Sequence, residues 1–559
     1  MHLDRSYTPA KSQEGKQYCR ILLRDSYRDA HGHVKHHTIA NLSHCSEQEI
    51  QAIELALKHK KDLESLRQNL HDPFHLRQGL SFGAIFLLQQ MAQRLGIARA
   101  LGSGREGQLA LWQVIARALA QGSRLSAVRL ATSHAVGEIL DLAPFNEDHL
   151  YANLAWLAEQ QSHIEQALFR HAYPSGAPEL FLYDVTSTYL EGDCNALAAW
   201  GFNRDGKAGK KQLVLGLLCD QQGQALSIEV FVGNTSDLKT FAPQIHKVLQ
   251  RFGAQNVTFV GDRGMIRGPQ IQQLAQVGFH YITAITKPQI QSLLDQKVLQ
   301  LGLFEEPLAE VEDTEGKVRY LLRRNPERQK EMAASRRARQ QKMERLVKQA
   351  NAYLSQHPRA RLATQEKNLR PKLASLKLGA WMELKKKQGQ LVLEVKASAL
   401  EEDSKLDGCY VLKTDLPASL ASAQVVHERC KDLALVEQSF RTMKTVELEL
   451  RPVYVRLEQT TRGHALVVML AYRLIKELEK CWCQQNITVE EGLKELDTLC
   501  LTEVVVNGQV KDETIPEPRA PLRELLALAK VELPKKLRRR KLNVATKQKL
   551  PKHRPRRSK

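Results

Sequence analysis

Five short runs rich in β-branched and aromatic residues lie between residues 180 and 285, and their order constrains the fold more than any other feature of the chain. The first three runs follow one another directly. A segment with helical spacing of apolar residues separates the third run from the fourth, and another separates the fourth from the fifth. The pattern predicts strands at 180–189, 212–219, 226–232, 257–260 and 281–285, with helices at 238–252 and 269–277.

Three strands, a helix, a strand, a helix and a strand is the order of a ribonuclease H-like (RNase H-like) α/β fold. The sequence before it differs in character, because apolar residues recur at intervals of three and four from residue 46 to about 172. After it, residues 286–406 interrupt the pattern with two strands and a long polar helix at 326–354. We therefore expect an α/β protein in which an RNase H-like core carries a large, partly β insertion and follows a mainly helical N-terminal region.

The predicted organisation has six parts. Within the second part, the segment 123–142 fits either a helix-turn-helix that reads DNA or a plain helical bundle. The parts are an N-terminal β hairpin region (1–45, with strands at 18–24 and 34–39), a helical, candidate DNA-binding region (46–175), the first part of the core (176–285), the insertion (286–406, with strands at 318–323 and 391–397), the second part of the core (407–480, with helices at 428–444 and 464–478) and a C-terminal region with a basic tail (481–559).

The charge balance points to a polyanionic partner. The formal net charge is +20, with 82 Lys and Arg against 62 acidic residues, and nucleic acid is the simplest such partner. After Pro534 the chain holds 13 Lys or Arg and no acid, which is typical of a tail that binds phosphates without reading bases. The helix at 326–354 carries eight Lys or Arg against three Glu, and it either lies along DNA or is a solvated hairpin. A soluble basic protein without such a partner is the alternative.

Several classes of protein are excluded. No stretch approaches the roughly 20 apolar residues that span a bilayer, and the N-terminus lacks the apolar region of a secretion signal. The nine cysteines include no Cys-x-x-Cys pair, so we expect neither a zinc site nor a disulfide framework. A cytoplasmic, nucleoid-associated protein without a membrane part is expected. Four histidines near the predicted hairpin, His31, His33, His36 and His37, fit either a metal site or simply a polar hairpin.

Three acidic residues stand out by their placement. Asp184 lies within the first core strand, Asp262 follows the fourth strand and precedes Arg-Gly, and Glu437 lies on a predicted helix. Because the first and fourth strands are neighbours in an RNase H-like sheet, Asp184 and Asp262 should converge, and Glu437 can complete the site. Three carboxylates repel one another unless cations neutralise them, and their oxygens suit Mg²⁺ (or Mn²⁺). Two such ions about 4 Å apart stabilise the attacking and leaving oxygens of phosphoryl transfer.

Around these acids the chain resembles the DDE transposases of bacterial insertion sequences. Their insertion-sequence-four superfamily has a third block Y-x2-R-x3-E-x6-K, in which Glu437 takes the E and Lys444 the K, whereas Cys430 and Leu433 stand where the Tyr and Arg would be. The closer similarity is to the IS1634-like branch. It rests on the runs Leu-Val-Glu-Gln-Ser-Phe-Arg-Thr-Met-Lys at 435–444, Leu-Arg-Pro-Val-Tyr at 450–454 and Gly-Asn-Thr-Ser-Asp at 233–237.

The resemblance covers roughly residues 18–478, and it implies an RNase H-like catalytic core with an insertion, mostly β, between the second Asp and the Glu. It implies a transposase that binds double-stranded DNA at element ends and at the target, cleaves with two Mg²⁺ (or Mn²⁺) ions held by Asp184, Asp262 and Glu437, and joins the ends by strand transfer. It further implies a homodimer in the synaptic complex. Two alternatives stay open: an RNase H-like nuclease without joining activity, and a catalytically inactive, transposase-derived DNA-binding protein.

Weaker roles fall to residues near the acids. Arg441 and Lys444 lie four and seven residues after Glu437 and are candidate contacts to the phosphates of the scissile strand. In some relatives a Trp of the insertion traps a flipped base; Trp381 is the sole candidate here, and core packing is the favoured alternative. His464 is expected to pack or to cap a helix. Arg263, Arg451, Arg456 and Arg462 are further candidate DNA contacts, with surface salt bridges as the alternative.

Overall fold

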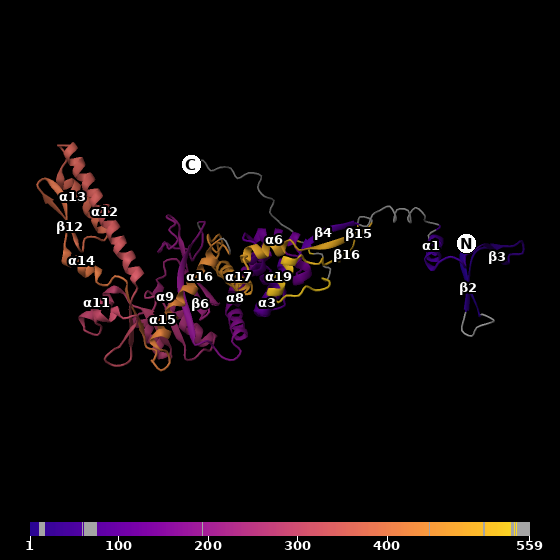
Figure 1. The fold of residues 1–559 in the computed structure, drawn as a ribbon, viewed down its shortest axis with the longest axis horizontal. Coiled ribbons are helices and arrows are strands. Elements are labelled where there is room, and N and C mark those ends of the chain that lie inside the picture. The colour runs from indigo at the N-terminus through magenta and orange to yellow at the C-terminus, as the bar shows by residue number, and fades with distance from the viewer. Residues whose placement is uncertain are drawn as a thin grey trace. The chain divides into compact units, whose positions relative to one another are not determined.

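The computed structural model describes residues 1–9, 17–58, 60, 75–192, 194–445, 448–506, 509–537, 542 and 544 (Figure 1). Nearly all of the basic tail after Pro534 lies outside these ranges, so its predicted phosphate binding lies outside the described residues. The chain forms two compact units: Met1–Gly79 with Cys500–Glu517 and Pro534–Lys536, and a second unit built mainly from Leu80–Leu499 and Pro518–Leu533.

The first unit is mostly β. Its antiparallel sheet has the order β1-β2-β3, so the strands predicted at 18–24 and 34–39 are confirmed, and β1 is an addition. A second sheet has the order β16-β15-β4; the strand β4 corrects the expectation that residues 46–172 are helical throughout. Its polar sequence gives little local signal, and it forms by pairing with a C-terminal strand. The elements are β1 (His2–Pro9), β2 (Gln17–Arg28), β3 (Val34–Asn41), α1 (Glu47–Lys58), β4 (His75–Ser81), β15 (Cys500–Val506) and β16 (Gln509–Thr514).

The four histidines near the first hairpin are exposed. In the described residues, no three His, Cys, Asp or Glu side chains are grouped as a metal site, here or elsewhere. The exposure of the four side chains is compatible with a polar hairpin.

The second unit begins with a helical bundle around α17. This helix is buried along most of its length because it packs against α8 and α5. A Cβ atom at Gly463 would lie 1.9 Å from the carbonyl oxygen of Leu154, so glycine permits the close approach of α17 to α8. The bundle contains α3 (Gly83–Arg94), α4 (Ile97–Leu101), α5 (Arg105–Leu119), α6 (Arg124–Ser133), α7 (Val136–Leu140), α8 (Glu147–Ala172), α17 (Glu458–Trp482), α18 (Val489–Asp497) and α19 (Ala520–Leu528).

The segment 123–142 folds as the helix pair α6 and α7. Helix α7 has only five residues, and none of them is exposed. A recognition helix needs a free face that enters a DNA groove. The structure therefore agrees with a plain bundle here and not with a helix-turn-helix that reads DNA.

Next comes an eight-stranded mixed sheet with the order β10-β11-β14-β9-β8-β5-β6-β7. All five strands and both helices predicted between residues 180 and 285 are confirmed within a few residues. Strand β5 pairs antiparallel with β6 and parallel with β8, and β8 pairs parallel with β9. These elements are β5 (Leu180–Tyr189), β6 (Gln212–Asp220), β7 (Ala225–Val232), α9 (Asp237–His246, continued by a π-helical turn, Lys247–Arg251), β8 (Thr258–Gly261), α10 (Gly268–Gln276) and β9 (His280–Ala284).

The insertion contains strands and is therefore partly β, as expected from the sequence. It is mostly helical, however, whereas the family resemblance implied a mostly β insertion, and its strands β10 and β11 join the central sheet through β14. Without β14 the strand β9 would present an open edge, and the added strands cover it. The elements are α11 (Lys287–Asp295), a 3₁₀ turn (Leu301–Glu305), β10 (Ala309–Glu312), β11 (Arg319–Arg324), α12 (Pro326–Gln356), α13 (Leu362–Ser375), β12 (Met382–Lys387), β13 (Gln390–Val395), α14 (Ala397–Ser404) and β14 (Cys409–Thr414).

Residues 326–404 form a lobe with a core of its own, built by α12, α13 and the β12–β13 hairpin (Figure 1). Trp381 is 1% exposed inside this core, which confirms the packing interpretation and leaves its ring unable to stack on a base as it stands. The lobe leaves the sheet after β11 and returns at β14, where Arg324 and Cys409 are partners in register. Its two ends therefore lie side by side.

Two helices, α15 (Ala423–Lys431) and α16 (Leu433–Lys444), replace the single helix predicted at 428–444. In the part of the chain that the structure describes, none of the helices is both long and apolar enough to span a bilayer.

Candidate active site

Strand β5 presents its two faces to different partners. Phe181, Tyr183 and Val185 point into an aromatic core that includes Phe241 of α9. Because side chains alternate along a strand, Asp184 and Thr186 lie on the opposite face. Helix α16 lies on that face, where the Lys444 ammonium donates to the Thr186 hydroxyl at 3.0 Å. Asp184 therefore points toward the helix that carries Glu437.

Asp262 reaches the same region from the neighbouring strand. Strand β8 ends at Gly261, which is level with Tyr183 in the parallel pairing with β5, so the next residues, Asp262 and Asp184, lie at the same height. The predicted convergence of the two aspartates follows from this register.

The charges of the other two acids act on Asp184. Burial raises the pKa of Asp184 to about 7, and the negative charges of Glu437 and Asp262 act in the same direction. The backbone N–H of Val185, which donates to its carboxylate at 2.7 Å, and the positive charge of Arg204 lower this pKa in part. Asp184 is thus a largely buried acid coupled to two others.

The three carboxylates do not form a closed ligand set as they stand, since the described residues contain no group of three metal-ligand side chains. Asp262 and Glu437 are exposed, and one oxygen of Asp262 accepts the N–H of Arg263 at 2.7 Å. Exposed side chains can change rotamer without disturbing packing, whereas Asp184 is held by its surroundings. The donor set, three carboxylates on elements packed together, fits a hard divalent cation.

The pKa of Asp184 predicts a stability effect. Its raised value means that the folded protein binds this proton more tightly than the unfolded chain does, so stability falls as pH rises from about 4 to about 7. In a metal chelator at pH 8, Asp184→Asn should therefore raise the free energy of unfolding by on the order of 2–4 kcal/mol. Urea denaturation of both proteins at pH 5 and pH 8 measures this. If the variant gained as much free energy of unfolding at pH 5 as at pH 8, the raised pKa of Asp184 would be contradicted.

A buried ion cluster ties α16 to the sheet. The Asp205 carboxylate, with its side chain 4% exposed, accepts from Lys444 at 2.7 Å and from Arg451 at 2.8 Å. Lys444 also donates to the carbonyl oxygen of Ser187 at 2.7 Å. Lys444 therefore lies inside the protein, joining the helix of Glu437 to the strand of Asp184.

Sequence reasoning missed Asp205 and Arg204, which lie in the loop between β5 and β6. The Arg204 guanidinium donates to both carboxylate oxygens of Asp237 at 2.8 Å. Asp237, from the Gly-Asn-Thr-Ser-Asp run, and Asp262 both approach the position of a Cβ atom at Gly264, at 3.5 and 3.9 Å. A polar loop has no periodic signal that would have singled out these residues.

The remaining candidates are placed as follows. Arg441, one turn after Glu437, is exposed, and so are Arg263 and Arg456. Arg462 donates to Glu458 at 2.9 Å and to Glu229 at 3.2 Å, which agrees with the salt-bridge alternative. His464 is buried beside Arg124 in the bundle, which confirms the packing interpretation.

Cys430, at the position of the signature Tyr, lies close to the acids. Burial raises the pKa of its thiol to about 11, and the charge of Asp262 acts in the same direction. Leu433 begins α16. The two departures from the signature therefore lie at the end of α15 and the start of α16, and the three acids themselves are present.

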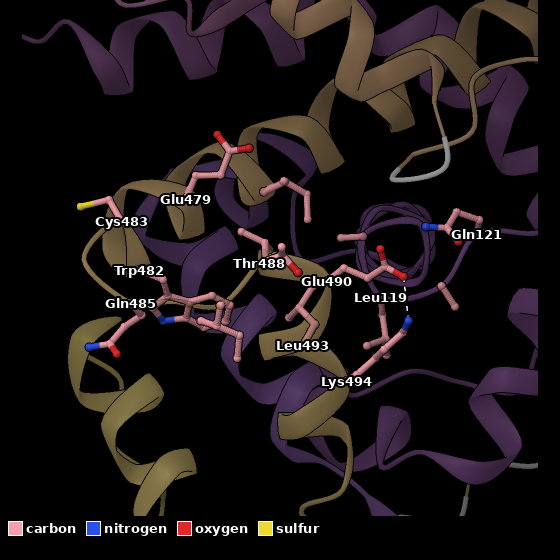
Figure 2. A pocket seen from close by; sticks show the side chains of 15 residues that line it. Leu119, Gln121, Glu479, Trp482, Cys483, Gln485, Thr488, Glu490, Leu493 and Lys494 are labelled. Atoms are coloured by element: carbon pink, nitrogen blue, oxygen red, sulfur yellow. Dashed lines mark hydrogen bonds and ion pairs between the residues drawn. The ribbon is translucent and has the colours of Figure 1, made fainter.

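A large cavity of about 590 Å³ lies elsewhere, in the helical bundle (Figure 2). It is lined by the end of α5 and by α17 and α18, with Leu119, Trp482 and Leu493 on its walls. The Glu490–Lys494 ion pair borders it at 2.7 Å. None of the three acids lines this cavity, so it is separate from the candidate active site.

The mixed sheet has adjacent parallel strands that present two aspartates, and a packed helix carries a glutamate. Comparison with known families gives the class of the protein. The model of the transposase DDE domain matches residues 175–474, more than half of the chain, so the chain belongs to the DDE transposases. It is a DNA transposase, an enzyme that cleaves DNA and transfers strands, and its family uses divalent metal ions. The model of the N-terminal domain of IS1634 family transposases matches residues 7–69, so this segment is similar to the start of those transposases.

Two solved structures are similar to this chain. The piggyBac transposase synaptic complex with hairpin DNA has 9% identity and a TM-score of 0.33, with 75% of this chain and 69% of that chain covered. The Mos1 transposase paired-end complex with the left transposon end has 10% identity and a TM-score of 0.14, with 29% and 59% covered. No curated protein sequence matches the chain.

Proposed function

We propose that Asp184, Asp262 and Glu437 are the catalytic acids of this transposase and hold two Mg²⁺ (or Mn²⁺) ions. The observation that carries the proposal is the coupling of a largely buried Asp184 to the charges of Asp262 and Glu437 across adjacent parallel strands and a packed helix. The strand order β7-β6-β5-β8-β9 and its directions support classifying the core as RNase H-like.

Bound divalent ions would activate the attacking oxygen and stabilise the leaving oxygen of a phosphodiester. The three carboxylates would hold the ions, and Asp184 must first release its proton to do so. In the first step water attacks phosphorus and the bond to the 3′ oxygen breaks, which leaves a 3′-OH at the element end. In the second step this hydroxyl attacks a phosphodiester of the target DNA and displaces another 3′ oxygen. Neither step needs a covalent protein–DNA intermediate.

The basic residues divide into two roles in this proposal. Arg441, Arg263 and Arg456 are exposed and are proposed to contact DNA phosphates beside the acids. Lys444 is buried in the Asp205 cluster, so we revise its role from a phosphate contact to a positioning residue. Arg451 shares that cluster and, with its side chain 35% exposed, can also face DNA.

We further propose a homodimer in the synaptic complex, because two element ends must be held together, and a place on the cytoplasmic nucleoid, where the DNA substrate lies. Double-stranded DNA at the element ends and at the target is the proposed partner. The net charge of +20 supports DNA as this partner.

The decisive experiment incubates the purified protein with Mg²⁺, a target plasmid and DNA that carries the sequences flanking its gene. Joined products from the wild type, and none from Asp262→Ala, would support the proposal. Cutting without joining would favour the nuclease alternative. Binding with neither reaction, under conditions in which a related transposase works, would favour an inactive DNA-binding protein.

A further inference from the structure

The second half of the loop between β5 and β6, residues 199–211, exposes two aromatic rings. Trp200 is 65% exposed and Phe202 is 76% exposed, which places them among the most exposed large hydrophobic side chains of the described residues. Exposed aromatic rings that stand close together indicate a binding surface more often than an isolated exposed aliphatic residue does. The fold itself does not use these rings.

The loop is firmly held, so the rings are presented from a defined backbone. Ala199 and Gln212 exchange backbone hydrogen bonds at 3.1 and 2.8 Å. A Cβ atom at Gly201, between the two aromatic residues, would lie 1.9 Å from the carbonyl oxygen of Gly233, so the loop backbone packs directly on the backbone after β7. Further along, the buried Asp205 fixes the loop to Lys444 and Arg451.

Arg204 links the loop to the region of the proposed catalytic acids, because its positive charge acts on Asp184. The backbone N–H of Arg204 donates to the Ser187 hydroxyl, three residues after Asp184 on β5, at 3.0 Å. The Arg204 guanidinium lies 5.6 Å from the centre of the Phe202 ring while it binds Asp237. One arginine thus connects the aromatic surface to the acidic site.

This part of the loop is basic, which favours a polyanion as its occupant. Between residues 200 and 211 the chain has four Lys or Arg against a single acid, Asp205, which binds Lys444 and Arg451. Of the four cations, Arg204 is paired with Asp237 and Lys210 with Glu191. Lys207 is exposed, and so its ammonium is available to a phosphate. Aromatic rings interleaved with basic residues suit unpaired nucleic acid, because rings stack on bases while cations contact the backbone.

We propose that the β5–β6 loop is a DNA subsite in which Trp200 and Phe202 stack on unpaired bases next to the scissile phosphodiester and Lys207 contacts the adjoining phosphates. The location of the subsite rests on the proposed function, because Asp184 and its partners define where the scissile bond lies. A base next to a nick or a free end lacks one stacking neighbour, and the exposed rings replace that neighbour. If the rings instead bind a partner protein, the affinity of this chain for DNA should not depend on the presence of bases. Probes with and without bases therefore distinguish the two occupants.

The test measures binding of the full-length protein, in a metal chelator, to two fluorescent DNA probes. One is a duplex with an unpaired thymidine overhang, and the other has the same overhang without bases. The wild type is expected to bind the probe with bases about tenfold more tightly. Trp200→Ala and Phe202→Ala should each remove most of this difference, whereas Trp200→Phe should keep it. Lys207→Ala should weaken binding to both probes equally, because both retain their phosphates.

Leu420→Ala is the matched control. Leu420 is 69% exposed, and it follows β14, which runs antiparallel to β9, so the chain leaves β14 at the end of the strands opposite to the end where Asp262 follows β8. This variant should bind both probes as the wild type does. An undiminished preference for bases in the Trp200→Ala, Phe202→Ala double variant would overturn the subsite, as would a wild type without any preference.

Failure of the subsite and failure of the proposed function give different results. Asp262→Ala should keep the preference for bases while losing cleavage. If the loop variants lose the preference but the acid variants still cleave, the loop binds DNA and the assignment of the acids is wrong. If the acid variants lose cleavage but the loop variants keep the preference, only the subsite is wrong.

Discussion

Replacing Asp184, Asp262 or Glu437 by its amide is expected to reduce both DNA cleavage and strand transfer at least about a thousandfold, or about 4 kcal/mol in activation free energy. An amide keeps the size of the side chain but removes the charge that holds a divalent cation and balances the developing negative charge on phosphate. DNA binding should be retained, because phosphate contacts come from the basic residues. Gel assays of cleavage and joining in Mg²⁺, beside a binding assay, measure the three effects separately.

Glu428→Gln provides a matched control for this series. Glu428 is an exposed acid on α15, the helix that precedes the one with Glu437, and its carboxylate accepts from Gln424 on its own helix. Its amide should cleave and join DNA at the wild-type rate. If Glu437→Gln kept full strand transfer in Mg²⁺, the assignment of the third metal ligand would be wrong.

Removal of Asp205 is expected to have the largest effect on stability. Its side chain is 4% exposed and accepts from both Lys444 and Arg451, so Asp205→Ala leaves a buried ammonium without a counter-charge. Loss of one partner of a buried ion pair costs about 3–5 kcal/mol of unfolding free energy. Urea denaturation at neutral pH measures the loss.

A double-mutant cycle tests whether Asp205 acts through Lys444. Asp205→Ala should cost less in a Lys444→Met background, because the ammonium that needed neutralising is gone, and the coupling should reach at least about 1 kcal/mol. Lys494→Ala is the control, because it removes an exposed ion pair with Glu490, 2.7 Å apart. It should lower the free energy of unfolding by less than about 1 kcal/mol. Additive losses in the cycle would show that Lys444 does not depend on Asp205. If Lys444 positions α16, the helix that carries Glu437, Lys444→Met should also raise the Mg²⁺ concentration needed for DNA cleavage.

The strands of the core could be predicted because buried strands form continuous apolar runs between polar turns. That signal fixed β5 to β9 within a few residues, and the strand order then brought Asp184 and Asp262 together. The pairing of β10 and β11 with β14 could not be predicted, since sheet membership depends on contacts between distant segments. Strand β4 was missed for the same reason.

Within the site, the sequence identified residue types better than their environments. Helical spacing places Glu437 and Lys444 on similar faces of one helix, yet Glu437 is exposed and Lys444 is buried. The difference arises because the end of α16 lies against β5 and the β5–β6 loop, which no local pattern encodes. Asp205 could not be identified for a related reason, because its partners, Lys444 at the end of α16 and Arg451 in the segment after it, lie more than 200 residues away in the sequence.

The attachment of residues 326–404 has a consequence for how transposases of this architecture can diversify. The lobe departs and returns at neighbouring positions of β11 and β14, and the N–H of Asn325 donates to the Gly408 carbonyl at 2.9 Å where its two ends meet. A lobe joined to a sheet in this way behaves like a long hairpin loop. Its length and surface can change over evolution without altering the register of the strands β11 and β14. The lobe can therefore vary independently of the acidic residues carried by β5 and α16 and of the one that follows β8.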